Sequence, residues 1–298
     1  MRLKYFLLLL CFGLTTSIFS QLKKIKIDGA EINYLDKGIG VPVVFVHGGM
    51  EDYRTWDPQI DTFSKYYRVI AYSRRFNYPN QNLTDIKDFS ALTEANDLAA
   101  LIIQLKLPPV HLVGHSFGGL IALCLAKNYP QLVRSLTLSE PPIISWLPDL
   151  PNGKKLYDDF YQRFLQPVKR DFEQKDTIAV LRHTLLYFNG EDISAQLPPE
   201  IRTQLIANFP EWRAIVYSIN AFPSIEKEEV QNLKIPVFLL SAGQTLPILQ
   251  PINAELKRLL HVAQHFQLDD GTHDYWSTHP KQMGDALLSF LRSAPKTE

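Results

Sequence analysis

Short runs of apolar residues recur along the chain and predict the strands of a sheet. Alternating apolar and polar positions at 22–27 and 31–35, on either side of Asp28-Gly29, predict a hairpin with a two-residue turn. The later runs are continuously apolar, as in strands that are buried on both faces. They lie at 43–46, 69–72, 110–113, 136–138 and 237–240, and a last short strand is predicted at 265–268.

Segments with helical spacing separate the apolar runs. The clearest of them lie at 92–105, 117–128, 252–260 and 283–291. Strands that alternate with helices are typical of a mostly parallel sheet covered by helices on both faces. The pattern therefore predicts an α/β fold.

The stretch 141–223 interrupts this alternation. It is polar and aromatic, it begins with two prolines, and it lacks a β-branched run that would predict a strand. Its helical segments lie at 156–164, 178–186 and 201–207. We interpret this stretch as a helical lid inserted above the sheet, so that residues 21–140 and 224–298 form the core.

The first twenty residues differ from the rest of the chain. Arg2 and Lys4 accompany an apolar run at 5–14, which has the length of a signal-peptide core and is too short to span a membrane. We therefore expect residues 1–20 to be a signal peptide and the protein to be exported, either to the periplasm or as a secreted protein. An uncleaved signal would tether the protein to the membrane, whereas no stable membrane span is expected after cleavage.

The overall composition narrows the choice of partner. The chain has 298 residues, and its 31 lysines and arginines balance its 31 aspartates and glutamates. A protein that binds nucleic acid would show a basic excess, so we expect a small-molecule substrate and no nucleic acid. Without the signal peptide Cys124 is the remaining cysteine, and we expect it to be a buried small hydrophobe without a disulfide partner. Nothing in these numbers indicates an oligomeric state.

The most informative motif follows the predicted strand at 110–113. The segment Gly114-His115-Ser116-Phe117-Gly118 matches the pattern G-x-S-x-G and leads directly into a predicted helix. A serine on such a sharp strand-to-helix turn has a strained backbone, and glycines two residues away on either side avoid clashes. We therefore expect Ser116 to be a nucleophile, with the backbone N–H of Phe117 forming part of an oxyanion hole.

A second motif, His47-Gly48-Gly49, follows the predicted strand at 43–46. Glycines allow backbone amides to approach a substrate oxygen closely. We assign the second oxyanion donor to Gly49, with the Met50 amide as the alternative.

A third motif, Gly271-Thr272-His273, lies between the last predicted strand and the closing helix. The general base that activates a serine must come from a loop above the strand ends. His273 has this position, and we expect it to be the base.

Together these motifs resemble those of the α/β-hydrolase superfamily, in particular its lidded esterase-like, haloperoxidase-like and proline-iminopeptidase-like members. The similarity extends from about residue 22 to the end of the chain and is weakest in the insertion. It implies a serine, a histidine and an acid in that family's catalytic triad, a chemistry that needs no cofactor. The motifs are specific for the fold and the triad and leave the substrate open.

The acid departs from the commonest pattern of that superfamily. Most members carry an aspartate shortly after the strand that precedes the histidine strand, but residues 241–247 of this chain contain no carboxylate. Glu140 follows the strand at 136–138, and the order Ser116, Glu140, His273 agrees with the order of nucleophile, acid and base in the superfamily. We expect Glu140 to be the acid. The alternatives, in decreasing order, are a residue of the Asp269-Asp270 pair and Asp274.

We expect neither a metal nor a cofactor. The chain has no Cys-x-x-Cys pair, no G-x-G-x-x-G that opens a helix, and no phosphate-binding loop.

The predicted reaction is acyl transfer through an acyl-enzyme on Ser116, with a small carboxylic ester or lactone as the substrate. Aromatic side chains of the predicted lid could line the pocket, and we name Trp146, Trp276 and Met50 as its candidate residues. Arg74 and Arg75, after the strand at 69–72, could bind a substrate carboxylate or only water. The alternatives are an iminopeptidase or amidase, a hydrolase of carbon–carbon bonds, and a non-catalytic ligand receptor with the same fold.

Overall fold

The computed structural model describes residues 22–80 and 88–294. The predicted signal peptide, residues 1–20, lies outside the described residues.

Eight strands of the described residues form one sheet in the order β1-β2-β4-β3-β5-β6-β7-β8. The strands are β1 (Lys23–Ile27), β2 (Ala30–Lys37), β3 (Pro42–Val46), β4 (Arg68–Tyr72), β5 (Val110–His115), β6 (Val133–Ser139), β7 (Val237–Ala242) and β8 (Gln264–Leu268). β2 runs antiparallel to β1 and β4, and the other neighbouring pairs are parallel. The prediction of a mostly parallel sheet is confirmed.

The antiparallel hairpin at the start of the sheet follows from its turn. Asp28 and Gly29 both have positive φ, 48° and 80°, which is the backbone conformation of a type I′ turn. Asp-Gly favours this turn because glycine adopts positive φ without strain. The predicted hairpin is therefore present.

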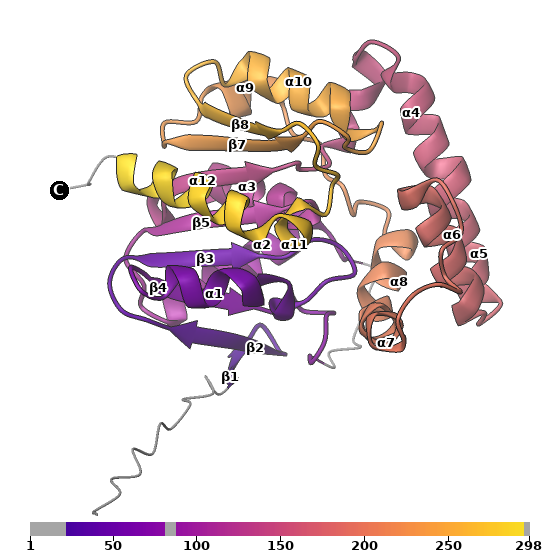
Figure 1. The fold of residues 1–298 in the computed structure, drawn as a ribbon, viewed down its shortest axis with the longest axis horizontal. Helices are drawn as coiled ribbons and strands as arrows, with labels where there is room; N and C mark the ends of the chain where they lie inside the picture. The colour runs from indigo at the N-terminus through magenta and orange to yellow at the C-terminus, as the bar shows by residue number, and fades with distance from the viewer. Residues whose placement is uncertain (1–21, 81–87, 295–298) are drawn as a thin grey trace, which may run out of the picture.

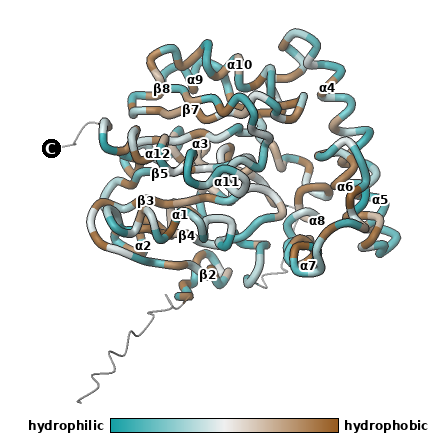
Figure 2. The backbone as a smooth tube through the Cα atoms, viewed as in Figure 1, coloured by the Kyte–Doolittle hydropathy of each residue, from teal (hydrophilic) through white to brown (hydrophobic). Residues whose placement is uncertain are grey.

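Helices cover both faces of the sheet (Figure 1). Outside the insertion they are α1 (Asp57–Phe63), α2 (Ala91–Gln104), α3 (Phe117–Asn128), α9 (Lys227–Gln231), α10 (Leu249–Leu259), α11 (Tyr275–Thr278) and α12 (Pro280–Ser293). Alternate residues of each strand serve the two faces: Phe45 packs in the cluster that contains α1 and α12, and Val44 packs in the cluster that contains α2 and α3. The central strands are largely hydrophobic, whereas polar residues are concentrated on the outer turns and helices (Figure 2).

Short helices also join the main elements. They are η1 (Tyr53–Trp56), η2 (Pro130–Leu132) and η3 (Ile144–Asp149).

Cys124 is fully buried in α3 as predicted, and burial raises the pKa of its thiol to about 12. A thiol with this pKa stays protonated at neutral pH and is not a competing nucleophile.

The stretch between β6 and β7 is helical throughout its described secondary structure. After η3 it contains α4 (Gly153–Phe160), a π-helical turn η4 (Tyr161–Leu165), α5 (Gln166–Glu173), α6 (Thr177–Asn189), α7 (Pro199–Ala207) and α8 (Phe209–Tyr217). Helices α4 to α8 gather beyond the carboxyl ends of the parallel strands (Figure 1). We call residues 141–223 the helical insertion. It packs through aromatic contacts: the ring centroid of Phe164 lies 4.9 Å from that of Tyr187 and 5.3 Å from that of Trp212.

Candidate active site

Ser116 occupies the turn between β5 and α3 with a strained backbone. Its φ is 50° and its ψ is −124°, a conformation that L-residues rarely adopt. A Cβ on Gly114 would lie 2.4 Å from the Gly118 carbonyl oxygen, and one on Gly118 would lie 2.3 Å from the Val46 carbonyl oxygen. Both glycines are therefore required by the tight approach of the backbone, as the motif predicted. The Ser116 N–H is held by the Ser139 carbonyl oxygen at 2.8 Å.

Glu140 lies directly after β6 and contacts His273. Its Oε2 accepts a hydrogen bond from His273 Nδ1 at 2.7 Å and another from Thr245 Oγ1 at 2.7 Å. Its Oε1 accepts from the Ala242 N–H at 2.9 Å and from Asn253 Nδ2 at 3.0 Å. The side chain is fully buried, so these four donors compensate for the water that the carboxylate loses.

The Glu140 contact determines the state of the His273 ring. The Glu140 carboxylate accepts a hydrogen bond from the Nδ1–H group, so the neutral ring carries its proton on Nδ1 and has an unprotonated Nε2 that can act as a base. Burial alone would lower the pKa of His273, but the hydrogen bond and negative charge of Glu140 outweigh burial and raise that pKa above its usual value. The ring also packs against His115, with 4.7 Å between the ring centroids.

The other carboxylates near His273 in sequence do not occupy this position. Asp269 and Asp270 are exposed at the end of β8. Asp274 is exposed and is the N-terminal cap residue of α11, although it lines the same cavity as His273. Glu140 is the carboxylate bonded to His273 Nδ1.

The loop after β3 presents three consecutive amides close to Ser116. A Cβ on Gly48 would lie 3.1 Å from Ser116 Cβ, which measures how closely the loop approaches the serine. The Gly48 N–H donates to Glu51 Oε2 at 2.7 Å, and the Met50 N–H donates to Glu211 Oε2 at 2.8 Å. Because its N–H is bonded to Glu211, Met50 is a poor alternative for the oxyanion donor, and Gly49 remains the predicted one.

Glu51 is a carboxyl group that the sequence motifs did not identify. It lines the cavity together with Ser116, and its Oε1 is 3.9 Å from His115 Nε2. Burial raises the pKa of Glu51 to about 7; the Gly48 hydrogen bond acts in the opposite direction, and the nearby charge of Asp274 reinforces burial. A carboxyl group with this pKa titrates near neutral pH. The sequence around Glu51 gives no sign of this property, because it arises from burial in the folded protein.

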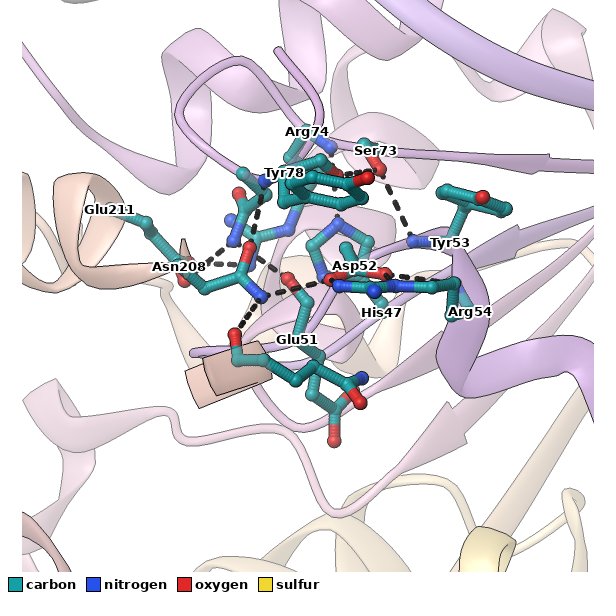
Figure 3. A network of polar contacts seen from close by, with 12 residues as sticks. His47, Glu51, Asp52, Tyr53, Arg54, Ser73, Arg74, Tyr78, Asn208 and Glu211 are labelled. Carbon is teal, nitrogen blue, oxygen red and sulfur yellow. Dashed lines mark hydrogen bonds and ion pairs between the residues drawn. The ribbon is translucent and has the colours of Figure 1, made fainter. Parts of the chain in front are cut away.

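Arg74 and Glu211 form a buried ion pair that joins the helical insertion to the core (Figure 3). Both side chains are fully buried. Arg74 Nη2 also donates to the Gly48 carbonyl oxygen at 2.8 Å, and Glu211 Oε2 also accepts from Asn77 Nδ2 at 2.9 Å. The suggestion that Arg74 binds a substrate carboxylate or water is wrong, because its partners are protein groups; Arg75 is likewise paired with Asp97.

His47 serves this loop as a neutral ring. Its Nε2 accepts the Arg74 N–H at 3.1 Å, and its Nδ1 lies 2.9 Å from the Gly48 carbonyl oxygen. Complete burial and the charge of Arg74 lower the pKa of His47 well below its usual value. His47 therefore contributes to the loop geometry, in agreement with its place in the motif.

A cavity of about 340 Å³ opens onto Ser116 and His273. Its polar end carries Glu51 and Asp274, and its remaining wall is mostly apolar. The insertion supplies much of that wall, namely Phe160, Phe164, Thr184, Leu185, Tyr187, Phe188, Asn189, Ile193, Leu197, Ile201, Leu205, Trp212, Ile215 and Phe222. None of the described residues that line it is a lysine or arginine.

Of the three predicted pocket residues, the structure places Met50 at the cavity and the two tryptophans away from it. Met50 lines the cavity, whereas Trp146 and Trp276 do not. Trp146 is buried and donates to the Ile225 carbonyl oxygen at 2.6 Å, so it anchors the insertion. Trp276 is buried against Trp56 and donates to Ser139 Oγ at 2.9 Å. Both indole N–H groups find partners inside the protein, and this turns the rings away from the pocket.

Of the helices in the described part of the chain, none has the length and apolar composition that a membrane span needs. Residues 22–80 and 88–294 contain no group of three or more His, Cys, Asp or Glu side chains that could hold a metal ion.

Known proteins resemble this chain in sequence and in fold. A family model described as alpha/beta hydrolase fold matches residues 41–275. The Azorhizobium caulinodans protein named "Putative carbamate hydrolase RutD" is 24% identical over 267 residues, which are 88% of this chain and 95% of that protein.

Solved structures show the same fold. Est816, described as an N-acyl homoserine lactone degrading enzyme, has a TM-score of 0.69 at 22% identity and covers 90% of this chain and 100% of its own. Carboxylesterase CesB from Bacillus subtilis has a TM-score of 0.73 at 19% identity, with 92% of each chain covered.

Proposed function

Because the chain belongs to the alpha/beta hydrolase fold family, we propose that this hydrolase cleaves a small carboxylic ester or lactone through an acyl-enzyme on Ser116. One observation carries the proposal. The strained Ser116 and the His273–Glu140 pair open onto one largely apolar cavity. A nucleophile on a strained turn, a base oriented by a buried carboxylate and a pocket beside them are the parts that acyl transfer needs.

The first step is acylation of the serine. His273 Nε2 accepts the proton of Ser116 Oγ as that oxygen attacks the substrate carbonyl carbon. The negative charge that develops on the carbonyl oxygen is stabilised by the N–H groups of Gly49 and Phe117, the latter at the positive end of α3. Protonated His273 then gives its proton to the leaving alkoxide, which departs as the alcohol.

The second step releases the acid. His273 removes a proton from water, and the resulting hydroxide attacks the acyl-enzyme carbonyl. The bond to Ser116 Oγ breaks, and the serine recovers its proton from His273. Glu140 keeps Nδ1 protonated through both steps and stabilises the charged ring.

The cavity supports a neutral, partly apolar substrate. Its wall is largely aromatic and aliphatic, which favours an alkyl or aryl group on the acyl or alcohol side. None of the described residues in this wall is a lysine or arginine, and this argues against the carboxylate-bearing substrates of carbon–carbon bond hydrolysis. Glu51 and Asp274 at the polar end would attract an ammonium group, so aminoacyl substrates stay the second candidate.

A substrate panel tests the proposal. It contains p-nitrophenyl esters of increasing chain length, lactones with and without an N-acyl group, a carbamate, and aminoacyl amides. We expect turnover of esters or lactones that disappears in Ser116→Ala. Turnover of amides alone would show that amides, and not esters or lactones, are the substrate class. Equal turnover by wild type and Ser116→Ala would refute the mechanism. A receptor with the same fold would turn over no member of the panel.

Export is part of the proposal and rests on residues 1–20, which lie outside the described residues. N-terminal sequencing of the protein recovered from the periplasm or medium tests it, and we expect a start near residue 21.

A further inference from the structure

Three consecutive amides follow β3, and carboxylates hold the two outer ones. The Gly48 N–H is bonded to Glu51 at 2.7 Å, and the Met50 N–H is bonded to Glu211 at 2.8 Å. The amide between them belongs to Gly49, the oxyanion donor of the proposed mechanism. One carboxylate comes from the same loop, whereas the other lies 161 residues away from Met50 in helix α8 of the insertion.

We propose that Glu51 and Glu211 act as a carboxylate clamp that aims the Gly49 N–H at the oxyanion, and that α8 must be seated on the core to complete the clamp. This inference rests on the proposed acyl transfer at Ser116. Glu51 and Glu211 are positioning residues, because they act through the backbone of Gly49.

The geometry of a peptide chain explains how the clamp works. Adjacent peptide planes share a Cα atom, and the Gly49 N–H lies in the plane of the Gly48–Gly49 peptide. Fixing the planes before and after this peptide therefore leaves the Gly49 N–H little freedom to rotate. Hydrogen bonds to a carboxylate are shorter and stronger than those to a neutral acceptor. A fixed donor costs no reorganisation when the oxyanion forms, which is the source of its catalytic effect.

Further contacts hold the clamp itself. Arg74 pairs with Glu211 and also donates to the Gly48 carbonyl oxygen, so one guanidinium links the α8 carboxylate to the backbone of the loop. Its positive charge also offsets the negative charge that Glu211 would otherwise place near the oxyanion. On the cavity side, the ring of Trp212 leaves no room for movement: a Cβ on Gly49 would lie 2.8 Å from Trp212 Cζ3.

The network offers a matched control in Asn208. Its side chain accepts from the Tyr78 N–H at 2.8 Å and donates to Asp52 Oδ2 at 2.9 Å (Figure 3). Asn208 is therefore a buried link between the insertion and the core, like Glu211, but it contacts none of the amides of residues 48–50.

The experiment compares Glu211→Ala, Glu211→Gln, Glu51→Ala and Asn208→Ala in the full-length mature protein. It measures kcat and KM on the best ester of the panel, the Ki of a trifluoromethyl ketone that mimics the tetrahedral intermediate, and the midpoint of thermal unfolding. For Glu211→Ala we expect kcat to fall about 10- to 100-fold, the Ki to rise by a similar factor, and KM to stay within about threefold.

The other variants separate positioning from stability. Glu211→Gln retains an acceptor for the Met50 N–H, so we expect it to recover part of the lost kcat. Asn208→Ala should lower the unfolding midpoint while kcat stays within about twofold of wild type. If Glu211→Ala does not fold, Glu51→Ala, on a partly exposed side chain, carries the test, and we expect its kcat to fall about tenfold.

Two results would overturn the clamp. In the first, Glu211→Ala or Glu51→Ala keeps the kcat and Ki of wild type. In the second, Asn208→Ala loses as much kcat as Glu211→Ala, which would make the effect one of docking alone. Failure of the proposed function would look different, because wild type itself would then not turn over the panel or would do so without Ser116.

Discussion

Glu140 Oε2 accepts a hydrogen bond from His273 Nδ1 at 2.7 Å, although the two residues are 133 positions apart in sequence. The contact exists because β6 and β7 are parallel neighbours, and their carboxyl ends meet at the loop that carries His273. Glu140 has a φ of 53°, so the chain accepts a strained backbone at the residue that presents this carboxylate.

Glu140→Gln should therefore disable the enzyme while leaving its fold intact. The amide can still occupy the site, but it does not stabilise the charged ring of His273 and can bind the wrong tautomer. We expect kcat to fall about 10³- to 10⁴-fold. The control is Asp269→Asn, an exposed carboxylate close to His273 in sequence, which should keep full activity. The reverse pattern would move the acid to the end of β8.

The pH dependence of kcat/KM should show an acid limb set by His273. The ring must be neutral to accept the serine proton, and its pKa is raised above 6.5 by Glu140. Activity should therefore fall as the pH falls through that raised pKa. Without the Glu140 charge burial dominates, so the limb of Glu140→Gln should move to lower pH. A limb that stays in place in this variant would contradict the pairing.

Glu51 is a second group that could shape this limb, because burial raises its pKa to about 7. Glu51→Gln distinguishes the two groups: the limb due to His273 should persist in this variant, and any part due to Glu51 should vanish. A limb that disappears completely would assign it to Glu51.

Glu94 should make the fold less stable as the pH rises. It is buried in α2, neither of its carboxyl oxygens has a hydrogen-bond partner among the described residues, and burial raises its pKa to about 8. Between pH 4.5 and 8 the unfolded chain releases this proton and the folded chain retains it, so the free energy of unfolding falls across that window.

Glu94→Gln removes this penalty. We expect the variant to raise the midpoint of thermal unfolding by about 2–6 °C at pH 8 and to change it little at pH 4.5. Glu173→Gln, on an exposed side chain, should show no such pH dependence. An equal shift at both pH values would mean that ionisation of Glu94 is not the cause.

Gly49→Ala tests the space around the predicted oxyanion donor. The new Cβ would lie 2.8 Å from Trp212 Cζ3, so either the loop or the indole ring has to move. We expect kcat to fall about 10- to 100-fold, because small displacements of an oxyanion donor are costly. Adding Trp212→Leu makes room and should restore part of the rate. No recovery in the double variant would indicate that the methyl group acts on the backbone alone.

The sequence was most informative where short segments impose their own geometry. The sharp turn at Ser116 requires glycine at positions 114 and 118, and buried strands require runs of apolar residues. The sequence pattern could therefore predict both the fold and the turn that carries the serine. Glu140 could be inferred because parallel strands end at the same edge of a sheet. In each case the physical cause lies in local structure or in a regular repeat.

Contacts made by the insertion could not be predicted in this way. Glu211 reaches Met50 across 161 residues, and no periodicity connects an α8 carboxylate to a loop amide. The prediction that Trp146 and Trp276 line the pocket differs from the structure because a large aromatic side chain near a site can face either the cavity or the core. Their hydrogen bonds to Ile225 and Ser139 hold both indole rings in the core. Such choices depend on tertiary packing.

The most direct test of acyl transfer on Ser116 is its labelling by a fluorophosphonate. Intact-protein and peptide mass spectrometry of wild type, Ser116→Ala, His273→Gln and Glu140→Gln would locate the adduct and give its rate of formation. We predict one adduct on the peptide that contains Ser116, none in Ser116→Ala, and labelling slowed by orders of magnitude in the other two variants. A folded wild-type protein that forms no adduct at Ser116 would contradict this mechanism.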